Sequence, residues 1–203
     1  MRHILFISYI CFAAVGGLHA TSSEVERLKG VIDAAIEALY GDCCADLPAE
    51  EKQQKVREAI ESEYDLDVII RRAIGRNWRS MNSEEQEEVL ELVKQLLVKA
   101  YVDGLEGRDP PKVELGEVVS ITDRRIEIPS RVTIDNQTVN VLYRLGKMSS
   151  GWQIYDIVAE DISVVANYRQ QIDDHFRRGD GQGLIKKLKA LLAQDEIDEE
   201  IQL

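Results

Sequence analysis

The first half of the chain repeats hydrophobic residues at spacings of three and four, which is the period of an amphipathic helix. In residues 25–39 this face ends just before Gly41, and glycine is typical of a helix C-terminus. Pro48 is typical of a first helical turn and is followed by a charged stretch. Asp65 is a candidate N-cap for a third helix, which ends near Gly75. The pattern therefore predicts three helices in this part of the chain.

A fourth helix is predicted from Ser83 to about Leu105, because Ser83 and Gln86 have the spacing of a capping box. Its apolar arc is wider than one packing face requires. Such an arc fits either a central helix packed on two sides or a helix that lines a cavity with part of its surface. The residues of the arc are Val89, Leu90, Leu92, Val93, Leu96, Leu97, Val98, Ala100 and Tyr101.

After Pro110 and Pro111 the hydrophobic period changes to two, which is typical of half-buried strands. Asp135 and Asn136 suit a tight hairpin turn between two of these strands. The expected strands cover residues 113–119 (a weaker pattern), 126–134, 139–145 and 152–158. Two helices, 162–177 and 184–193, close the chain. The pattern predicts an α+β fold with N-terminal helices, a four-stranded antiparallel meander and two C-terminal helices.

The two ends of the chain differ from the part between them. Residues 1–20 begin with a basic start and continue as an uncharged apolar run, which is typical of a cleaved secretory signal peptide. A retained membrane anchor is the alternative, but it requires about 18 or more apolar residues. Residues 195–203 form an acidic tail. We therefore expect one domain over residues 21–194 and an exported protein.

Charge and composition narrow the classes of partner. The chain has 37 Asp and Glu against 25 Lys and Arg, a net charge of -12, and removal of residues 1–20 takes away one base and leaves -13. Because nucleic-acid binding depends on clustered basic residues, we expect no nucleic-acid partner. An apolar content of 44% is enough to build a core and excludes disorder of the whole chain.

The sequence contains few residues that carry catalysis or bind metal. Beyond residue 20 the chain has one histidine, His175, in a polar stretch typical of a helix end, and two adjacent cysteines, Cys43 and Cys44. These two cysteines are compatible with free thiols, a strained bridge between neighbours or a bridge to another chain. Asp65 and Asp67 are better explained by helix capping than by metal binding. We therefore predict neither an enzyme nor a protein with a metal or cofactor.

An ordered set of short stretches runs along most of the chain behind the expected signal peptide: Tyr64–Asp67, Ile74–Arg79, Ser83–Gln86, Ala100–Tyr101, Val141–Leu145, Gly151–Ile157 and Ser163–Arg169. Together they resemble the MlaC family, also called toluene-tolerance proteins. These are periplasmic phospholipid-binding shuttles of the system that maintains outer-membrane lipid asymmetry. The sequence departs from the family pattern at Asp161, where glycine is usual, and at Ile172, where an aromatic residue is usual.

The resemblance implies a periplasmic phospholipid carrier whose helices and sheet enclose an apolar lipid pocket. It also implies two partners: an inner-membrane ABC transporter complex with an MCE-domain protein, and an outer-membrane lipoprotein–porin complex. A carrier of another apolar lipid such as a hopanoid, or a ligand-free interaction module, is the alternative. The predicted lipid-binding residues are Ile70, Ile74, Trp78, Val93, Leu97, Tyr101, Val141, Tyr143, Trp152, Ile154, Val164 and Tyr168. Basic candidates for a head-group or docking patch are Arg144, Arg169, Arg177 and Arg178.

Overall fold

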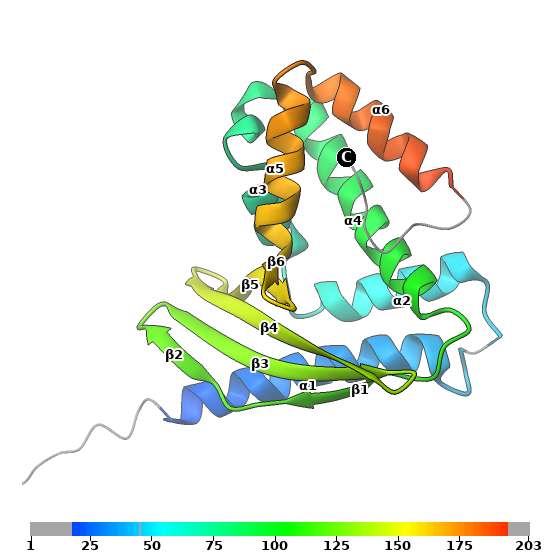
Figure 1. The fold of residues 1–203 in the computed structure, drawn as a ribbon, viewed down its shortest axis with the longest axis vertical. Coiled ribbons are helices and arrows are strands. Elements are labelled where there is room, and N and C mark those ends of the chain that lie inside the picture. The colour runs from blue at the N-terminus through cyan, green and yellow to red at the C-terminus, as the bar shows by residue number, and fades with distance from the viewer. Residues whose placement is uncertain (1–17, 45, 195–203) are drawn as a thin grey trace, which may run out of the picture.

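The computed structural model of the protein describes residues 18–44 and 46–194, in which helices pack against an antiparallel sheet (Figure 1). This confirms the α+β class. The helices are α1 (Leu18–Tyr40), α2 (Ala49–Glu61), α3 (Leu66–Ile74), the 3-10 helix η1 (Gly75–Ser80), α4 (Ser83–Leu105), α5 (Val164–Phe176) and α6 (Gly181–Leu192). The strands are β1 (Lys112–Leu115), β2 (Val119–Thr122), β3 (Arg125–Ile134), β4 (Gln137–Met148), β5 (Gly151–Ala159) and β6 (Ile162–Ser163).

The expected signal peptide and acidic tail lie largely outside the described residues. Only Leu18–Ala20 of the predicted signal segment are included, and they begin α1. Both expectations therefore stay predictions, as does the domain boundary at residues 21–194. Among the helices that the structure describes, none is long and apolar enough to cross a membrane.

The starts of the helices confirm one predicted cap and correct another. Asp65 caps α3, where its side chain accepts a hydrogen bond from the backbone N–H of Asp67 at 2.9 Å. The cap of α4 is Asn82, which forms the reciprocal box with Glu85, so the predicted Ser83–Gln86 box is wrong by one residue. The backbone of Asn82 is extended, and this makes Ser83 the first helical residue.

The glycine-rich residues just before the predicted helix 184–193 form the first turn of α6. Asp180 accepts a hydrogen bond from the backbone N–H of Gly183 at 2.9 Å, which caps the helix. The helix therefore starts three residues before the predicted residue 184. The Asp180 side chain stabilises this start because it satisfies a backbone N–H group that has no partner within the helix.

The sheet has six strands instead of the four predicted, in the order β1-β3-β4-β5-β6, with β2 also paired to β3. The weak strand predicted at 113–119 divides at Gly116 into β1 and β2. Gly116 donates a hydrogen bond to the carbonyl of Pro129 at 2.7 Å, and a Cβ on Gly116 would lie 3.0 Å from the Pro129 ring. Ile162 and Ser163 pair with β5 as β6, so α5 begins two residues later than predicted.

The expected hairpin turn between β3 and β4 is confirmed. Asp135 and Asn136 have positive φ values of 49° and 65° and connect the paired residues Ile134 and Gln137. Two left-handed residues match the twist of the flanking strands, which is the reason that Asp and Asn are preferred here.

The buried side chains of the described residues form three clusters. Leu28 and Val31 of α1 pack on one face of the sheet against Ile126, Ile128 and Leu145. A second cluster lies among α3, α4, α5 and α6, which form a helical layer beyond β5 and β6 (Figure 1). A third joins the C-terminal halves of α1 and α4 to α2. The wide arc of α4 is explained by its place in both helical clusters.

Candidate functional site

An apolar cavity of about 60 Å³ lies among α3, α4 and α5, with α6 behind it. Tyr168 lines the cavity with its ring carbons, all other lining side chains are hydrocarbon, and the cavity surface is entirely apolar. The lining residues are Ile69, Ile70, Ala73, Ile74, Val93, Leu96, Leu97, Val164, Val165, Tyr168, Ile172 and Leu188. Such a lining favours hydrocarbon and offers almost nothing to a polar ligand.

Helical periodicity directs these side chains into the cavity. Ile70 and Ile74 lie four residues apart on α3, and Val93 and Leu97 have the same spacing on α4. Residues four apart share one face of a helix, so each helix presents a continuous apolar strip to the cavity. Val164 opens α5 and Tyr168 follows one turn later. The cavity is therefore built from three strips of different helices.

Six of the twelve predicted lipid-binding residues meet at this cavity. They come from three helices, and the strands of the sheet separate α5 from α3 and α4 in the sequence, which supports treating them as one site. They are Ile70, Ile74, Val93, Leu97, Val164 and Tyr168.

The other six predicted residues lie elsewhere. Trp78 packs at the edge of the helical core, where the Arg71 guanidinium stacks 5.0 Å from the centre of its ring. Tyr143, Trp152 and Ile154 border the core between α1 and the sheet.

Val141 and Tyr101 are the remaining two. Val141 lines a separate hollow whose other walls include Arg131, Glu160 and Asp161, so its surroundings are partly charged. Tyr101 of α4 is 36% exposed. Nothing in the structure joins these two residues to the apolar cavity.

Tyr101 nevertheless has a link to the sheet. Burial among protein atoms and the nearby Tyr143 phenol on β4 together raise the pKa of Tyr101 to about 12. Burial likewise raises the pKa of Tyr143, against the effect of a hydrogen bond with Ser130. Both phenols therefore stay neutral at physiological pH.

Six of the residues that line the cavity were not predicted from the sequence. Ile69, Ala73 and Leu96 belong to helical patterns that were recognised, so the periodic signal was present but did not separate them from ordinary core. Val165, Ile172 and Leu188 lie on the last two helices, of which only Val164 and Tyr168 were predicted to bind lipid. They are placed in the lining by the packing of α5 and α6 over α3 and α4.

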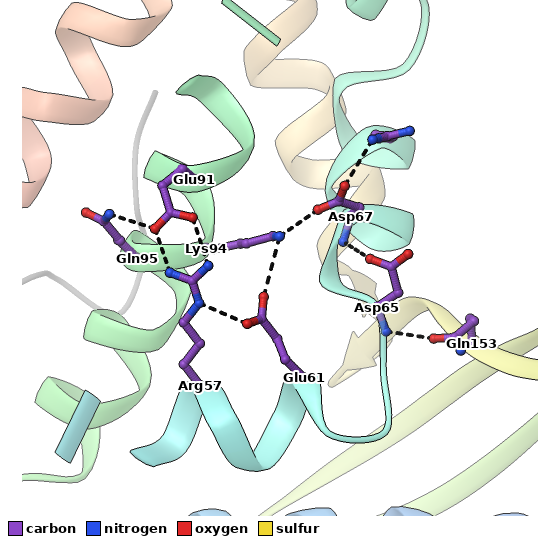
Figure 2. A network of polar contacts seen from close by, with 9 residues as sticks. Arg57, Glu61, Asp65, Asp67, Glu91, Lys94, Gln95 and Gln153 are labelled. Atoms are coloured by element: carbon purple, nitrogen blue, oxygen red, sulfur yellow. Dashed lines mark hydrogen bonds and ion pairs between the residues drawn. The ribbon is translucent and has the colours of Figure 1, made fainter. Parts of the chain in front are cut away.

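A network of charged side chains holds α2, α3 and α4 together beside the cavity (Figure 2). Arg57 of α2 donates two hydrogen bonds to the Glu91 carboxylate of α4, at 2.6 and 2.8 Å. Lys94 lies 2.8 Å from Asp67 of α3 and 3.4 Å from Glu61 of α2. Because Lys94 follows Val93 on α4, this network fixes the helix that contributes three side chains to the cavity lining.

The network predicts a modest acid sensitivity. The hydrogen bond from Arg57 lowers the pKa of Glu91 from 4.5 to about 2. A lowered folded-state pKa contributes stability above about pH 4.5, and that contribution disappears as the pH falls towards 2. Since the Glu91 side chain is 47% exposed, screening limits the effect to about 0.5–1 kcal/mol.

Glu91→Gln should therefore lower the free energy of unfolding at pH 7, and the difference from the unaltered protein should vanish near pH 2. Urea unfolding at pH 7, 4 and 2.5 measures this. Glu87→Gln is the matched control, since Glu87 is exposed on the same helix and forms no ion pair with a described residue. An equal loss for both variants at pH 7 would contradict the assignment.

The polar residues singled out in the sequence have structural roles. His175 lies in the last turn of α5, with Nε2 3.0 Å from the carbonyl oxygen of Asp180. Asp67 pairs with Arg71 at 3.0 Å, in addition to Lys94.

Three arginines of the expected basic patch make separate contacts within the fold. Arg144 binds Glu127 at 3.0 Å and Asp156 at 3.1 Å across the sheet, so its charge is balanced within the fold. Arg169 donates to the carbonyl oxygen of Arg72 at the end of α3, and Arg177 pairs with Asp174 at 2.8 Å. The predicted patch therefore does not form one free cationic surface.

Comparison with known proteins gives two findings. The family model described as MlaC protein matches residues 30–190. A structure of a phospholipid-binding protein from Ralstonia solanacearum, in complex with a phospholipid, is similar with a TM-score of 0.69 and 25% sequence identity. The similarity covers 83% of this chain and 98% of that chain. No curated protein sequence matched.

Proposed function

The chain belongs to the MlaC family, and we propose that it is a periplasmic carrier that holds the acyl chains of a phospholipid in the cavity among α3, α4 and α5. The observation that carries this proposal is the lining of that cavity, in which strips from three helices converge and offer hydrocarbon almost exclusively. The similar Ralstonia solanacearum protein, whose structure contains a phospholipid, supports the same ligand class.

The cavity is too small to admit an acyl chain unless the surrounding structure changes. A volume of about 60 Å³ is well below the roughly 300–1,000 Å³ of pockets that take drug-sized ligands. An acyl chain therefore enters only if the surrounding helices move apart. Because the lining side chains are separate strips of α3, α4 and α5, separation of these helices widens the cavity without breaking a strand pairing.

Transfer energetics explain why such a carrier works by docking. Each methylene group taken out of water contributes about 0.8 kcal/mol, so two chains with roughly 30 such groups amount to about 24 kcal/mol before costs. This exceeds the practical ceiling of about 18–21 kcal/mol for noncovalent affinity, so release into water is negligible. Between a bilayer and an apolar cavity most of this term cancels, and exchange is feasible at a membrane complex.

We therefore propose that the protein exchanges lipid with two membrane partners and thereby maintains outer-membrane lipid asymmetry. One is an inner-membrane ABC transporter complex that includes an MCE-domain protein, and the other is an outer-membrane lipoprotein–porin complex. Family membership supports both partners. An ATPase in the inner-membrane complex would supply the energy for directional transfer.

The direct test is to identify what the protein holds. The chain purified without detergent should release phospholipid into organic solvent, and native mass spectra should show the polypeptide with one lipid mass added. Mass spectrometry of the extract measures the lipid class. Spectra that show only the bare polypeptide would favour a ligand-free interaction module. A lipid without phosphorus, such as a hopanoid, would replace phospholipid as the cargo.

A further inference from the structure

Two adjacent cysteines lie in the turn that connects α1 to α2. Cys43 is exposed, whereas Cys44 is only 3% exposed. Cys44 donates a backbone hydrogen bond to the carbonyl of Gly41 at 2.8 Å and accepts one from Leu47 at 3.1 Å, so the backbone on both sides of the pair is held. The turn brings the two Sγ atoms to 2.6 Å from each other. The pair is therefore a dithiol with one sulfur open to solvent and the other behind it.

The two thiols are not equivalent in reactivity. The thiolate is the nucleophile in exchange with a disulfide, and an attacking sulfur must reach its target. The hydrogen bond with Cys43 and burial both raise the pKa of Cys44, and Glu37 raises it further, while Lys55 lowers it. Cys44 is thus kept as a thiol inside the turn. Reaction with a dissolved disulfide starts at the exposed Cys43.

We propose that Cys43 and Cys44 form a reversible thiol–disulfide site that reacts with small disulfides. In the first step the Cys43 thiolate attacks a disulfide R–S–S–R, which forms a mixed disulfide on Cys43 and releases RS⁻. In the second step the Cys44 thiolate, after loss of its proton to solvent, attacks the Cys43 sulfur. This closes the Cys43–Cys44 bond and releases the second RS⁻, so one external disulfide is reduced for each bridge that forms.

The covalent chain makes this bridge easy to reverse. Adjacent Cα atoms are about 3.8 Å apart, whereas the Cα atoms of ordinary disulfides are about 4.4–6.8 Å apart. A bridge between neighbours is therefore strained, and strained disulfides are the more readily reduced ones. Exposure of Cys43 also admits the attacking thiol of a reductant. The site is independent of the proposed lipid cavity, because neither cysteine lines it.

The test uses the full chain with Cys11→Ser, so that the pair provides the only thiols. After incubation with glutathione disulfide, the intact mass should fall by two hydrogens and no cysteine should react with maleimide. Addition of dithiothreitol should restore two maleimide-reactive thiols. A stable glutathione adduct on the unpaired Cys43, or disulfide-linked dimers as the main product, would overturn the proposal.

Single variants assign the order of the steps. Cys44→Ala should accumulate the glutathione adduct on Cys43, because no second thiol is present to displace it. Cys43→Ala should react about tenfold or more slowly, because the remaining thiol is buried. Equal rates for the two variants would refute the assigned order. Circular dichroism checks that each variant is folded, and Cys44→Ser is the second choice if Cys44→Ala is not.

Discussion

Ala73→Phe should reduce the phospholipid that copurifies with the protein by about tenfold or more. Ala73 lines the apolar cavity between Ile70 and Ile74 on α3. A phenyl ring at this position fills the cavity of about 60 Å³ that an acyl chain would enter. Loss of contact with two or three methylene groups removes about 2 kcal/mol of binding, which is more than tenfold in affinity. The new side chain is apolar and enters an apolar space, so the fold should persist.

The measurement is the molar ratio of extracted phospholipid to protein, together with the thermal unfolding midpoint. Ala190→Phe is the matched control, because Ala190 is exposed on α6 and does not line the cavity. Full lipid occupancy in a folded Ala73→Phe protein would place the acyl chains elsewhere. The predicted lipid-binding residues outside this cavity, among them Tyr101 and Tyr143, would then be the next candidates for the lipid site.

Leu145→Ala should destabilise the protein by about 3 kcal/mol, and Leu97→Ala should cost only about 1 kcal/mol. Leu145 is completely buried between the sheet and α1, so its truncation leaves a cavity in the core. Leu97 is half-buried and already borders a cavity, so truncation removes fewer contacts. The same substitution of leucine by alanine should therefore cost more stability at a core position than at a position in the cavity lining.

Urea unfolding of both variants, after refolding from denaturant to remove bound lipid, measures these two costs. The lipid content of the native proteins provides the complementary result. Leu97→Ala should weaken lipid retention, whereas folded Leu145→Ala protein should retain it. If both substitutions destabilise the protein equally, Leu97 is a core residue and the proposed site is misassigned at that position.

The sequence alone was sufficient for much of the fold. The helix over Ser83–Leu105 was predicted with its observed bounds, because the periodic pattern is long and begins with capping residues. Asp65 and the Asp135–Asn136 turn were predicted correctly because side-chain and backbone preferences act over two or three residues. The division of residues 113–119 at Gly116 was not predictable, since it depends on contact with Pro129.

Family membership was also accessible from the sequence, because an ordered set of short stretches runs along most of the chain. The division between core and cavity was not. Leu92 and Leu97 have the same side chain on the same helix, but Leu92 is buried and Leu97 borders the cavity. Nothing local distinguishes them, because burial is decided by which distant elements pack against each side of the helix. Residues 25–39 and 83–105 determined their own helices; only the packing of α5 and α6 against α3 and α4 decided where the space for a ligand lies.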